Sequence, residues 1–267
     1  MKEKKLTREN LLEQRHELLA SLKYASFIQK AVLPDQRYLE SVLNDHFILH
    51  KPRDIVSGDF YYCSRKEELT IVAAGDCTGH GVPGALMSIM GVSFLNEILS
   101  GSGPCKPSRI LNLLRERVMN ALHQRGEEAE NKDAMDMALC VYNSQTRVLQ
   151  YAGAHNPLYH VRKRVLTEIK ADKMPVGVNA IEEESFTNHN IQLKPGDTVY
   201  IFSDGYADQF GGPMDKKFKY GPMKELLIRI SDRPMEEQQH ELEHVIESWK
   251  GDKPQVDDIL LFGVRFV

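Results

Sequence analysis

The sequence predicts an α+β fold in which antiparallel β-sheets form a sandwich flanked by helices. Two observations lead to this prediction. From residue 54 onward, short strand-like segments follow one another at hairpin spacing, and two pairs of helix-like segments interrupt them. A long helix-like stretch precedes all of them, so we also expect an N-terminal helical extension outside the sandwich.

The first predicted element is a helix from about residue 6 to residue 32, which ends because the residue before Pro34 avoids the helical region. Apolar residues recur at every seventh position, at Leu11, Leu18, Ala25 and Val32. This stripe is compatible with a short coiled-coil seam or with the apolar face of a docked helix. Arg15 and Gln29 interrupt it.

The remaining elements are predicted from local periodicity and from turn residues. We expect strands over residues 54–62, 69–74, 137–142, 148–152, 158–161, 165–169, 186–193, 198–202 and 259–266. We expect helices from residue 82 to the break at Gly101, and over 107–124, 223–230 and 234–249. Residues 38–53 are interpreted as a connector, and residues 125–132 as a polar loop.

The composition restricts the class of protein. The chain has 267 residues, 42% of them hydrophobic, which allows one large domain with an appendage. A net charge of −4 with interspersed charges argues against a nucleic-acid partner. Four widely spaced cysteines and no apolar signal region favour a reduced, cytoplasmic protein. Polar residues and glycines break the longest apolar run, so we expect no membrane span.

Four short motifs place an aspartate beside a glycine or a second aspartate, where a strand should end in a loop. They are S-G-D-F at 57–60, G-D-C-T-G-H-G at 75–81, S-D-G-Y at 203–206 and D-D-I at 257–259. If the fold brings these carboxylates together, neighbours about 4 Å apart repel by roughly 1 kcal/mol in water and by more in a cleft. Such a cluster holds protons at raised pKa or binds Mg²⁺ or Mn²⁺. The motifs therefore favour metal-assisted hydrolysis at phosphorus.

Further motifs join these four in a fixed order. They include I-Q-K-A-V-L-P at 28–34, K-P-R-D-I-V at 51–56, Y-A-G-A-H-N-P at 151–157 and M-P-V-G at 174–177. Together they resemble the type 2C metal-dependent protein serine/threonine phosphatases. The closer resemblance is to the bacterial branch typified by stage II sporulation protein E and the stress-response regulator phosphatases. It implies a four-layer αββα sandwich for residues 36–267, with residues 1–35 as a helical linker.

The resemblance also implies a two-metal centre holding Mg²⁺ or Mn²⁺. Asp59 is expected to bridge both ions. Asp76 and the backbone carbonyl of Cys77 are expected to hold one ion, and Asp204 and Asp257 the other. This set supplies four carboxylates, whose charge balances that of two divalent cations.

Other residues near the motifs are less clearly marked. Asp258 falls where the wider family has a neighbouring polar residue, so it is a further candidate ligand. His80 is a candidate acid for the leaving oxygen, although a loop histidine that only contacts solvent explains it as well. His155 is interpreted as shaping its loop, and Asp136 as structural. Arg53 lies near the first motif but does not match the phosphate-binding arginine of eukaryotic members.

The sequence thus predicts a phosphatase acting on phosphoserine or phosphothreonine in a partner protein, through a water activated by two metals. The resemblance implies an anti-sigma-antagonist-type partner, and a switch in which the N-terminal helix, as a possible dimerisation element, controls the helix after residue 81. A catalytically inactive, phosphatase-shaped signalling module is the alternative, and the four intact aspartates argue against it. A nuclease is disfavoured because no basic groove is evident.

Overall fold

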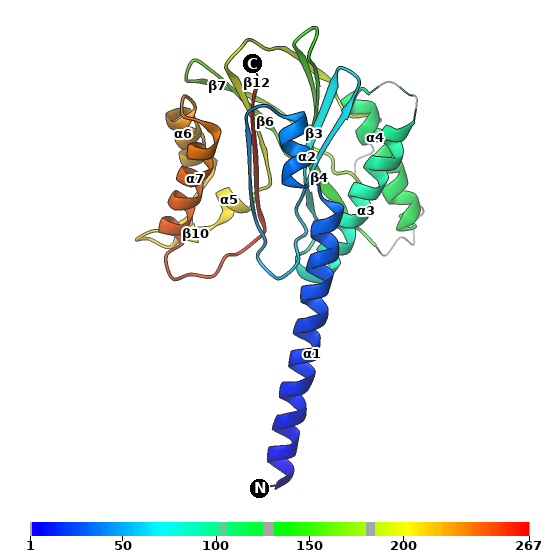
Figure 1. Ribbon diagram of the computed structural model, residues 1–267, viewed down its shortest axis with the longest axis vertical. Helices are drawn as coiled ribbons and strands as arrows, with labels where there is room; N and C mark the ends of the chain where they lie inside the picture. The colour runs from blue at the N-terminus through cyan, green and yellow to red at the C-terminus, as the bar shows by residue number, and fades with distance from the viewer. Residues whose placement is uncertain (1, 102, 104, 125–130, 180–184, 267) are drawn as a thin grey trace.

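The computed structural model describes residues 2–101, 103, 105–124, 131–179 and 185–266. Two five-stranded antiparallel sheets lie face to face, and helices cover their outer faces (Figure 1). This confirms the predicted α+β sandwich with four layers. Most of the predicted loop over 125–132 lies outside the described residues.

The first sheet has the strand order β1-β12-β9-β6-β7. Its strands are β1 (His46–Lys51), β6 (Leu158–Arg162), β7 (Val165–Ile169), β9 (Asp197–Phe202) and β12 (Ile259–Phe266). Helices α6 (Tyr220–Ile230) and α7 (Met235–Lys250) cover its outer face. Every residue of β9 is buried, as expected for a central strand that is covered on both faces.

The second sheet has the strand order β2-β3-β4-β5-β8. Its strands are β2 (Phe60–Lys66), β3 (Leu69–Cys77), β4 (Met135–Asn143), β5 (Val148–Ala154) and β8 (His189–Gln192). Helices α3 (Gly81–Ser100) and α4 (Pro107–Ala121) cover it. One apolar cluster fills the space between the sheets, and one lies under each helix pair.

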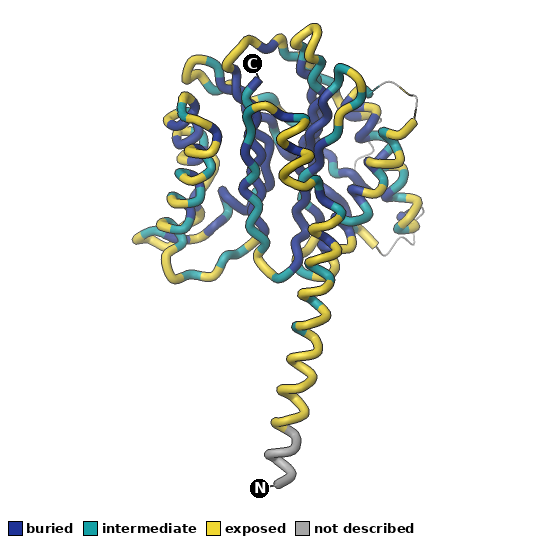
Figure 2. Tube along the Cα trace, viewed as in Figure 1, coloured by how far each residue is buried: buried dark blue, intermediate teal, exposed yellow. Residues whose placement is uncertain are grey.

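Helix α1 (Lys2–Val32) extends away from the body, and most of its described side chains are exposed (Figures 1 and 2). Leu11 and Leu18 are each 61% exposed, so the predicted apolar stripe is not covered there. The helix docks only near its C-terminal end. There the buried Gln29 amide donates to the Ser57 carbonyl and to Ser88 Oγ, and it accepts from the Ser57 N–H. Gln29, interpreted from the sequence as an interruption, is therefore the docking residue.

Two predictions of elements were wrong, and three short elements were missed. The supposed connector at 38–53 contains most of α2 (Gln36–Val42), which Asp35 caps, and all of β1. The strand predicted over 54–62 begins only at Phe60, because loop N–H groups before it bond to side chains such as Asp258. Helix α5 (Gly205–Asp208) and the short pair β10 (Phe210–Gly211) and β11 (Lys216–Lys217) were not predicted.

Among the described helices, α3 alone is long and apolar enough to cross a membrane, with a mean hydropathy of 1.5. In this fold it packs against α1, α4 and β3. Its apolar composition follows from this packing, since buried residues such as Met87, Val92 and Leu95 face the sheet and α4.

Candidate metal centre

The four motif aspartates meet at one end of the sandwich because of strand register. Asp59 precedes β2 and Asp76 ends β3, and these strands pair so that Phe60 lies opposite Gly75. Asp204 follows β9 and Asp257 precedes β12, which pair so that Phe202 lies opposite Leu261. Each antiparallel pair thus places two motifs side by side. The two sheets then bring both pairs to the same edge.

A cavity of about 210 Å³ opens between these motifs. Its walls are formed by Asp76, Cys77, Thr78, Gly79, His80, Ala134, Asp136, Asp204 and Asp257. Asp59 and Asp258 do not line it; each is only 2% exposed. The structure therefore gathers all the predicted acidic residues, some on the cavity wall and two in the buried layer next to it.

The carboxylates disturb one another strongly. Burial and the nearby charges of Asp204 and Asp257 raise the pKa of Asp76 to about 8. Burial and the charge of Asp257 raise the pKa of Asp204 to about 6. Burial, together with the charge of Asp76, also raises the pKa of Asp59 well above its usual range. Without cations, the cluster relieves its repulsion by taking up protons.

The two buried aspartates have fixed hydrogen-bond partners. Ser203 Oγ donates to Asp59 Oδ2 and accepts from the Leu260 N–H, so the position of Asp59 is set by the β9–β12 pair. Asp258 accepts the N–H groups of Arg53 and Gly58, each at 2.7 Å. Asp258 therefore ties the first motif loop to the start of β12.

Glycines allow the loops of the centre to approach α3. A Cβ on Gly84, in the first turn of α3, would lie 2.3 Å from the Gly79 carbonyl oxygen and 2.9 Å from the Gly58 Cα. Real Cβ atoms do not come this close, so only glycine permits the contact. The start of α3 is thereby held directly against both metal-loop motifs.

The Cys77 side chain does not act as a thiolate in this loop. The residue is 4% exposed, and burial together with the charge of Asp76 raises the pKa of its thiol well above the usual range. Cys77 lines the cavity, and with its thiol protonated the backbone carbonyl is the oxygen ligand that it could offer to an ion.

Two histidines at the centre each contact an aspartate. His80 Nδ1 lies 2.9 Å from Asp54 Oδ2, and His155 Nδ1 lies 2.8 Å from Asp136 Oδ1. His80 lines the cavity, as its motif position suggested. Asp136, interpreted from its sequence position as structural, also lines the cavity. The signal that could have identified it is the alternation of side chains along β4, in which Asp136 shares a face with Ala138 and Cys140.

The donor set fits hard divalent cations. Carboxylate oxygens and a backbone carbonyl are the ligands that Mg²⁺ and Mn²⁺ prefer, and cations would relieve the repulsion that raises these pKa values. Over the described ranges, no three Asp, Glu, His or Cys side chains are close enough to surround one ion. Each ion would therefore take few side chains and complete its shell with carbonyl oxygen and water, as Mg²⁺ commonly does.

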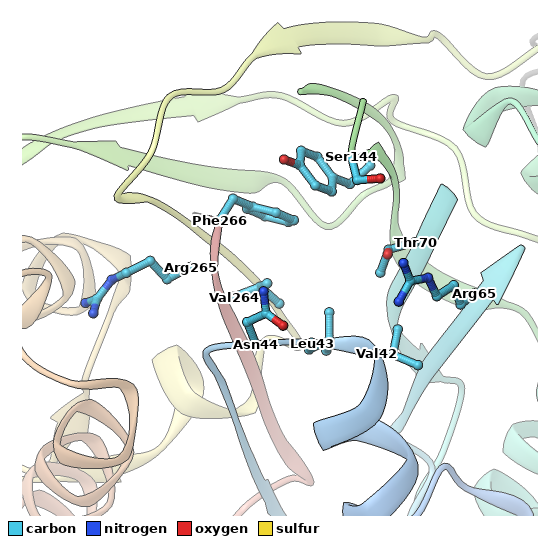
Figure 3. A pocket seen from close by; sticks show the side chains of 10 residues that line it. Val42, Leu43, Asn44, Arg65, Thr70, Ser144, Val264, Arg265 and Phe266 are labelled. Carbon is cyan, nitrogen blue, oxygen red and sulfur yellow. The ribbon is translucent and has the colours of Figure 1, made fainter. Parts of the chain in front are cut away.

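A second cavity, also of about 210 Å³, lies at the other end of the same strands (Figure 3). It is lined by Val42, Leu43, Asn44, Arg65, Thr70, Tyr142, Ser144, Val264, Arg265 and Phe266. None of these residues is acidic. Arg265 points away from the other labelled side chains and bonds to Asp45. The side chains that line this cavity offer no carboxylate to a metal ion.

Comparison with known proteins agrees with this geometry. The family model for stage II sporulation protein E (SpoIIE) matches residues 66–267. Phosphoserine phosphatase RsbU of Bacillus subtilis is 25% identical over 198 residues, which cover 72% of this chain and 55% of RsbU. The chain thus spans about half the length of this curated relative.

Solved structures share the whole architecture. The SiaA-PP2C domain of Pseudomonas aeruginosa superimposes with a TM-score of 0.86 at 31% identity, covering 95% of this chain and 99% of that domain. The PP2C domain of SpoIIE from Bacillus subtilis, solved with a regulatory fragment, gives a TM-score of 0.67 at 19% identity, over 83% of this chain and 63% of that one. The second likeness shows a common fold only.

The fold and the carboxylate cluster define a PP2C-type protein phosphatase domain, a metal-dependent class of hydrolases that act in signal transduction. Within this class, the chain belongs to the stage II sporulation protein E family. The family resemblance deduced from the motifs is therefore confirmed.

Proposed function

We propose that this chain hydrolyses phosphoserine or phosphothreonine in a signalling protein, using two Mg²⁺ or Mn²⁺ ions at the carboxylate cluster. The observation that carries the proposal is the convergence of Asp59, Asp76, Asp204 and Asp257 at one sheet edge in a member of this family. When bound, the ions supply an activated water and screen the phosphoryl charge. Nothing favours the inactive-module alternative, since all four carboxylates are present.

Asp76 is the carboxylate best placed to serve both ions. The charges of Asp204 and Asp257 raise its pKa, and its own charge raises that of Asp59, so it lies among all three. The sequence-based hypothesis gave the bridging role to Asp59. The surroundings favour Asp76 instead, with Asp59 and the Cys77 carbonyl on the side of one ion, and Asp204 and Asp257 on the side of the other. Because no three of the described side chains surround a single point here, bound water would bridge part of these contacts.

The remaining residues orient the ligands and attract the substrate. Since both oxygens of Asp258 accept backbone N–H groups, we propose that it fixes the first motif loop rather than ligating an ion. Arg53 and His80 lie close enough to Asp257 to lower its pKa, although burial raises it overall. Lys217 acts in the same way on Asp204. The positive charges of Arg53 and Lys217 beside the acidic centre would attract a phosphate dianion.

The proposal is tested by hydrolysis of p-nitrophenyl phosphate with Mn²⁺, with and without a chelator. We expect turnover that requires metal and that falls by orders of magnitude in Asp204→Asn. Asp252→Asn, at an exposed aspartate outside the cluster, is the matched control. Turnover without metal, or unchanged turnover in Asp204→Asn, would contradict the proposal.

The partner we propose is a phosphorylated protein of the anti-sigma-antagonist type. The support is family membership and the similarity to a protein named as a phosphoserine phosphatase. Comparison of phosphorylated proteins in cells with and without this chain would identify it. The cytoplasmic location remains a prediction.

We further propose that residues 1–35 form a linker whose exposed stripe pairs with a second copy. Leu11 and Leu18 lie seven residues apart, and both are largely exposed. Light scattering of the wild type and of Leu11→Glu combined with Leu18→Glu tests this. A monomeric wild type, or a dimer that survives both changes, would contradict the pairing.

A further inference from the structure

Asp76, Asp136 and His155 lie in one row across β3, β4 and the residue that follows β5. Asp76 on β3 is directly opposite Asp136 on β4. Met137 pairs with Ala154, so His155 is the next position along the same ladder and lies beside Asp136. Directly opposed residues project from the same face of a sheet, with Cβ atoms about 5 Å apart. The His155 ring is thus one strand removed from the acidic cluster and is joined to it through Asp136.

His155 is held from its backbone as well as from its ring. Its φ of 56° is in the left-handed region, which non-glycine residues seldom adopt. The His155 N–H donates to the Asp172 carbonyl at 2.9 Å. The Asp172 N–H in turn donates to the Gly153 carbonyl at 3.0 Å. Strained backbone that is fixed in this way is concentrated at functional sites.

The imidazole leaves one nitrogen free. Nδ1 is occupied by Asp136, and within the described parts of the chain no residue hydrogen-bonds to Nε2. The side chain is 41% exposed, so Nε2 remains accessible to a bound molecule. An aspartate on Nδ1 with a free Nε2 is the arrangement that fixes a histidine tautomer for proton transfer.

His80 has a similar aspartate partner, but that partner is placed differently. His80 is the N-cap residue of α3, and Asp54 on its Nδ1 does not line the acidic cavity. Asp136, on Nδ1 of His155, lines the cavity and lies directly opposite Asp76. Of the two histidines, His155 is therefore the one whose aspartate partner belongs to the acidic cluster.

We propose that His155 donates a proton from Nε2 to the leaving oxygen and that Asp136 positions the ring. Water forms the new bond to phosphorus, which leaves as inorganic phosphate, while the P–O bond to the leaving group breaks. The electron pair of that bond stays on the leaving oxygen, which takes the proton. His155 is left neutral and is reprotonated by solvent. This assignment rests on the proposed phosphatase function and adds the acid that the sequence could not identify.

The test compares two substrates with the Mn²⁺-loaded full chain. p-Nitrophenyl phosphate releases a weakly basic phenolate that needs no proton, whereas phenyl phosphate releases a stronger base. For His155→Gln we expect kcat on phenyl phosphate to fall by about 10²-fold or more, while kcat on p-nitrophenyl phosphate stays within about threefold. Asp136→Asn should show the same selectivity with a smaller loss. Mn²⁺ affinity, measured by calorimetry, should be unchanged in His155→Gln.

His80→Gln is the matched comparison, because that histidine also has an aspartate on Nδ1. We expect it to leave the ratio of the two kcat values unchanged. An equal loss on both substrates in His155→Gln, or a selective loss in His80→Gln, would overturn the assignment while leaving the phosphatase function intact. A wild-type chain that hydrolyses neither substrate would overturn both.

Discussion

The two ends of the sandwich carry cavities of equal volume, about 210 Å³, with opposite chemistry. At one end Asp76, Asp136, Asp204 and Asp257 share a wall, and burial raises the pKa of all four. Neighbouring carboxylates add to the rise for Asp76, Asp204 and Asp257. At the other end the rings of Tyr142 and Phe266 pack with centroids 4.3 Å apart, and no carboxylate lines the space. Volume therefore does not distinguish a functional cavity in this fold, whereas unrelieved charge does.

The sharpest test of this contrast removes one charge from the acidic end. Asp76→Asn keeps the size of the side chain but removes the carboxylate that lies among the others. Mn²⁺-dependent hydrolysis of p-nitrophenyl phosphate should fall by about 10³-fold or more, because metal ions contribute several kcal/mol to such reactions. Calorimetry should show weakened Mn²⁺ binding with the fold intact by circular dichroism. Full activity in this variant would show that the charge of the acidic cavity does not distinguish it from the opposite cavity.

The pH dependence of metal binding should follow from the raised pKa values. A carboxylate must lose its proton to bind a cation, so Mn²⁺ affinity should rise by up to about tenfold per pH unit below the pKa of Asp76. With that pKa at about 8, the rise should level off above pH 8. Titration calorimetry at several pH values measures it, and a flat profile from pH 6 to pH 8 would contradict it.

The stability of the metal-free fold should change with pH in the opposite direction to Mn²⁺ affinity. Folding raises the pKa of Asp76 to about 8 and that of Asp204 to about 6, so the folded state binds more protons. Stability should therefore fall as the pH rises from about 4, the usual aspartate value, toward 8. Bound Mn²⁺ should abolish this loss in thermal melts.

A smaller effect is expected from the glycine contact beside the acidic end. Gly84→Ala forces a Cβ against the Gly79 carbonyl, so α3 must shift. We expect a loss of about 1–3 kcal/mol in the free energy of unfolding, as for overpacked sites, and lower turnover. Gly221→Ala is the control, because this glycine lies in helix α6 with no atom within 4 Å of the new Cβ. It should lower neither the free energy of unfolding nor turnover. Denaturant unfolding and turnover assays would show whether the two variants behave alike.

The smallest effect should come from the opposite cavity. Thr70→Val removes a hydroxyl from its wall without changing the size of the side chain. Mn²⁺ affinity and turnover should stay at wild-type values, because no residue of this cavity contributes to the acidic cluster. A marked loss in either quantity would show that the two ends are coupled.

Features of the molecule that depend on local sequence patterns could be predicted. The motif aspartates, the fold class and the family followed from spacing and order. Asp136 was missed because its role depends on which face of β4 points inward. Ala138 and Cys140, on the same side of the strand, belong to the cluster between the sheets, so Asp136 also faces that space, where the cavity opens. The alternation along β4 could be read from the sequence, but which of its two faces points toward the other sheet could not.

Other residues could not be found by pattern at all. Gln29 is polar in an apolar stripe, and only the fold shows that Ser57 and Ser88 receive its amide. Asp258 was a candidate ligand from its motif, and only the fold shows that it also accepts the backbone N–H groups of Arg53 and Gly58, about 200 residues away along the chain. Long-range hydrogen bonds of this kind leave no periodic signal in a sequence.

One consequence concerns the cysteine in the loop of the candidate metal centre. Because the Cys77 thiol is buried and keeps its proton, it reacts slowly with peroxide or alkylating reagents. Oxidative bursts that silence thiolate-dependent hydrolases would therefore leave this centre working.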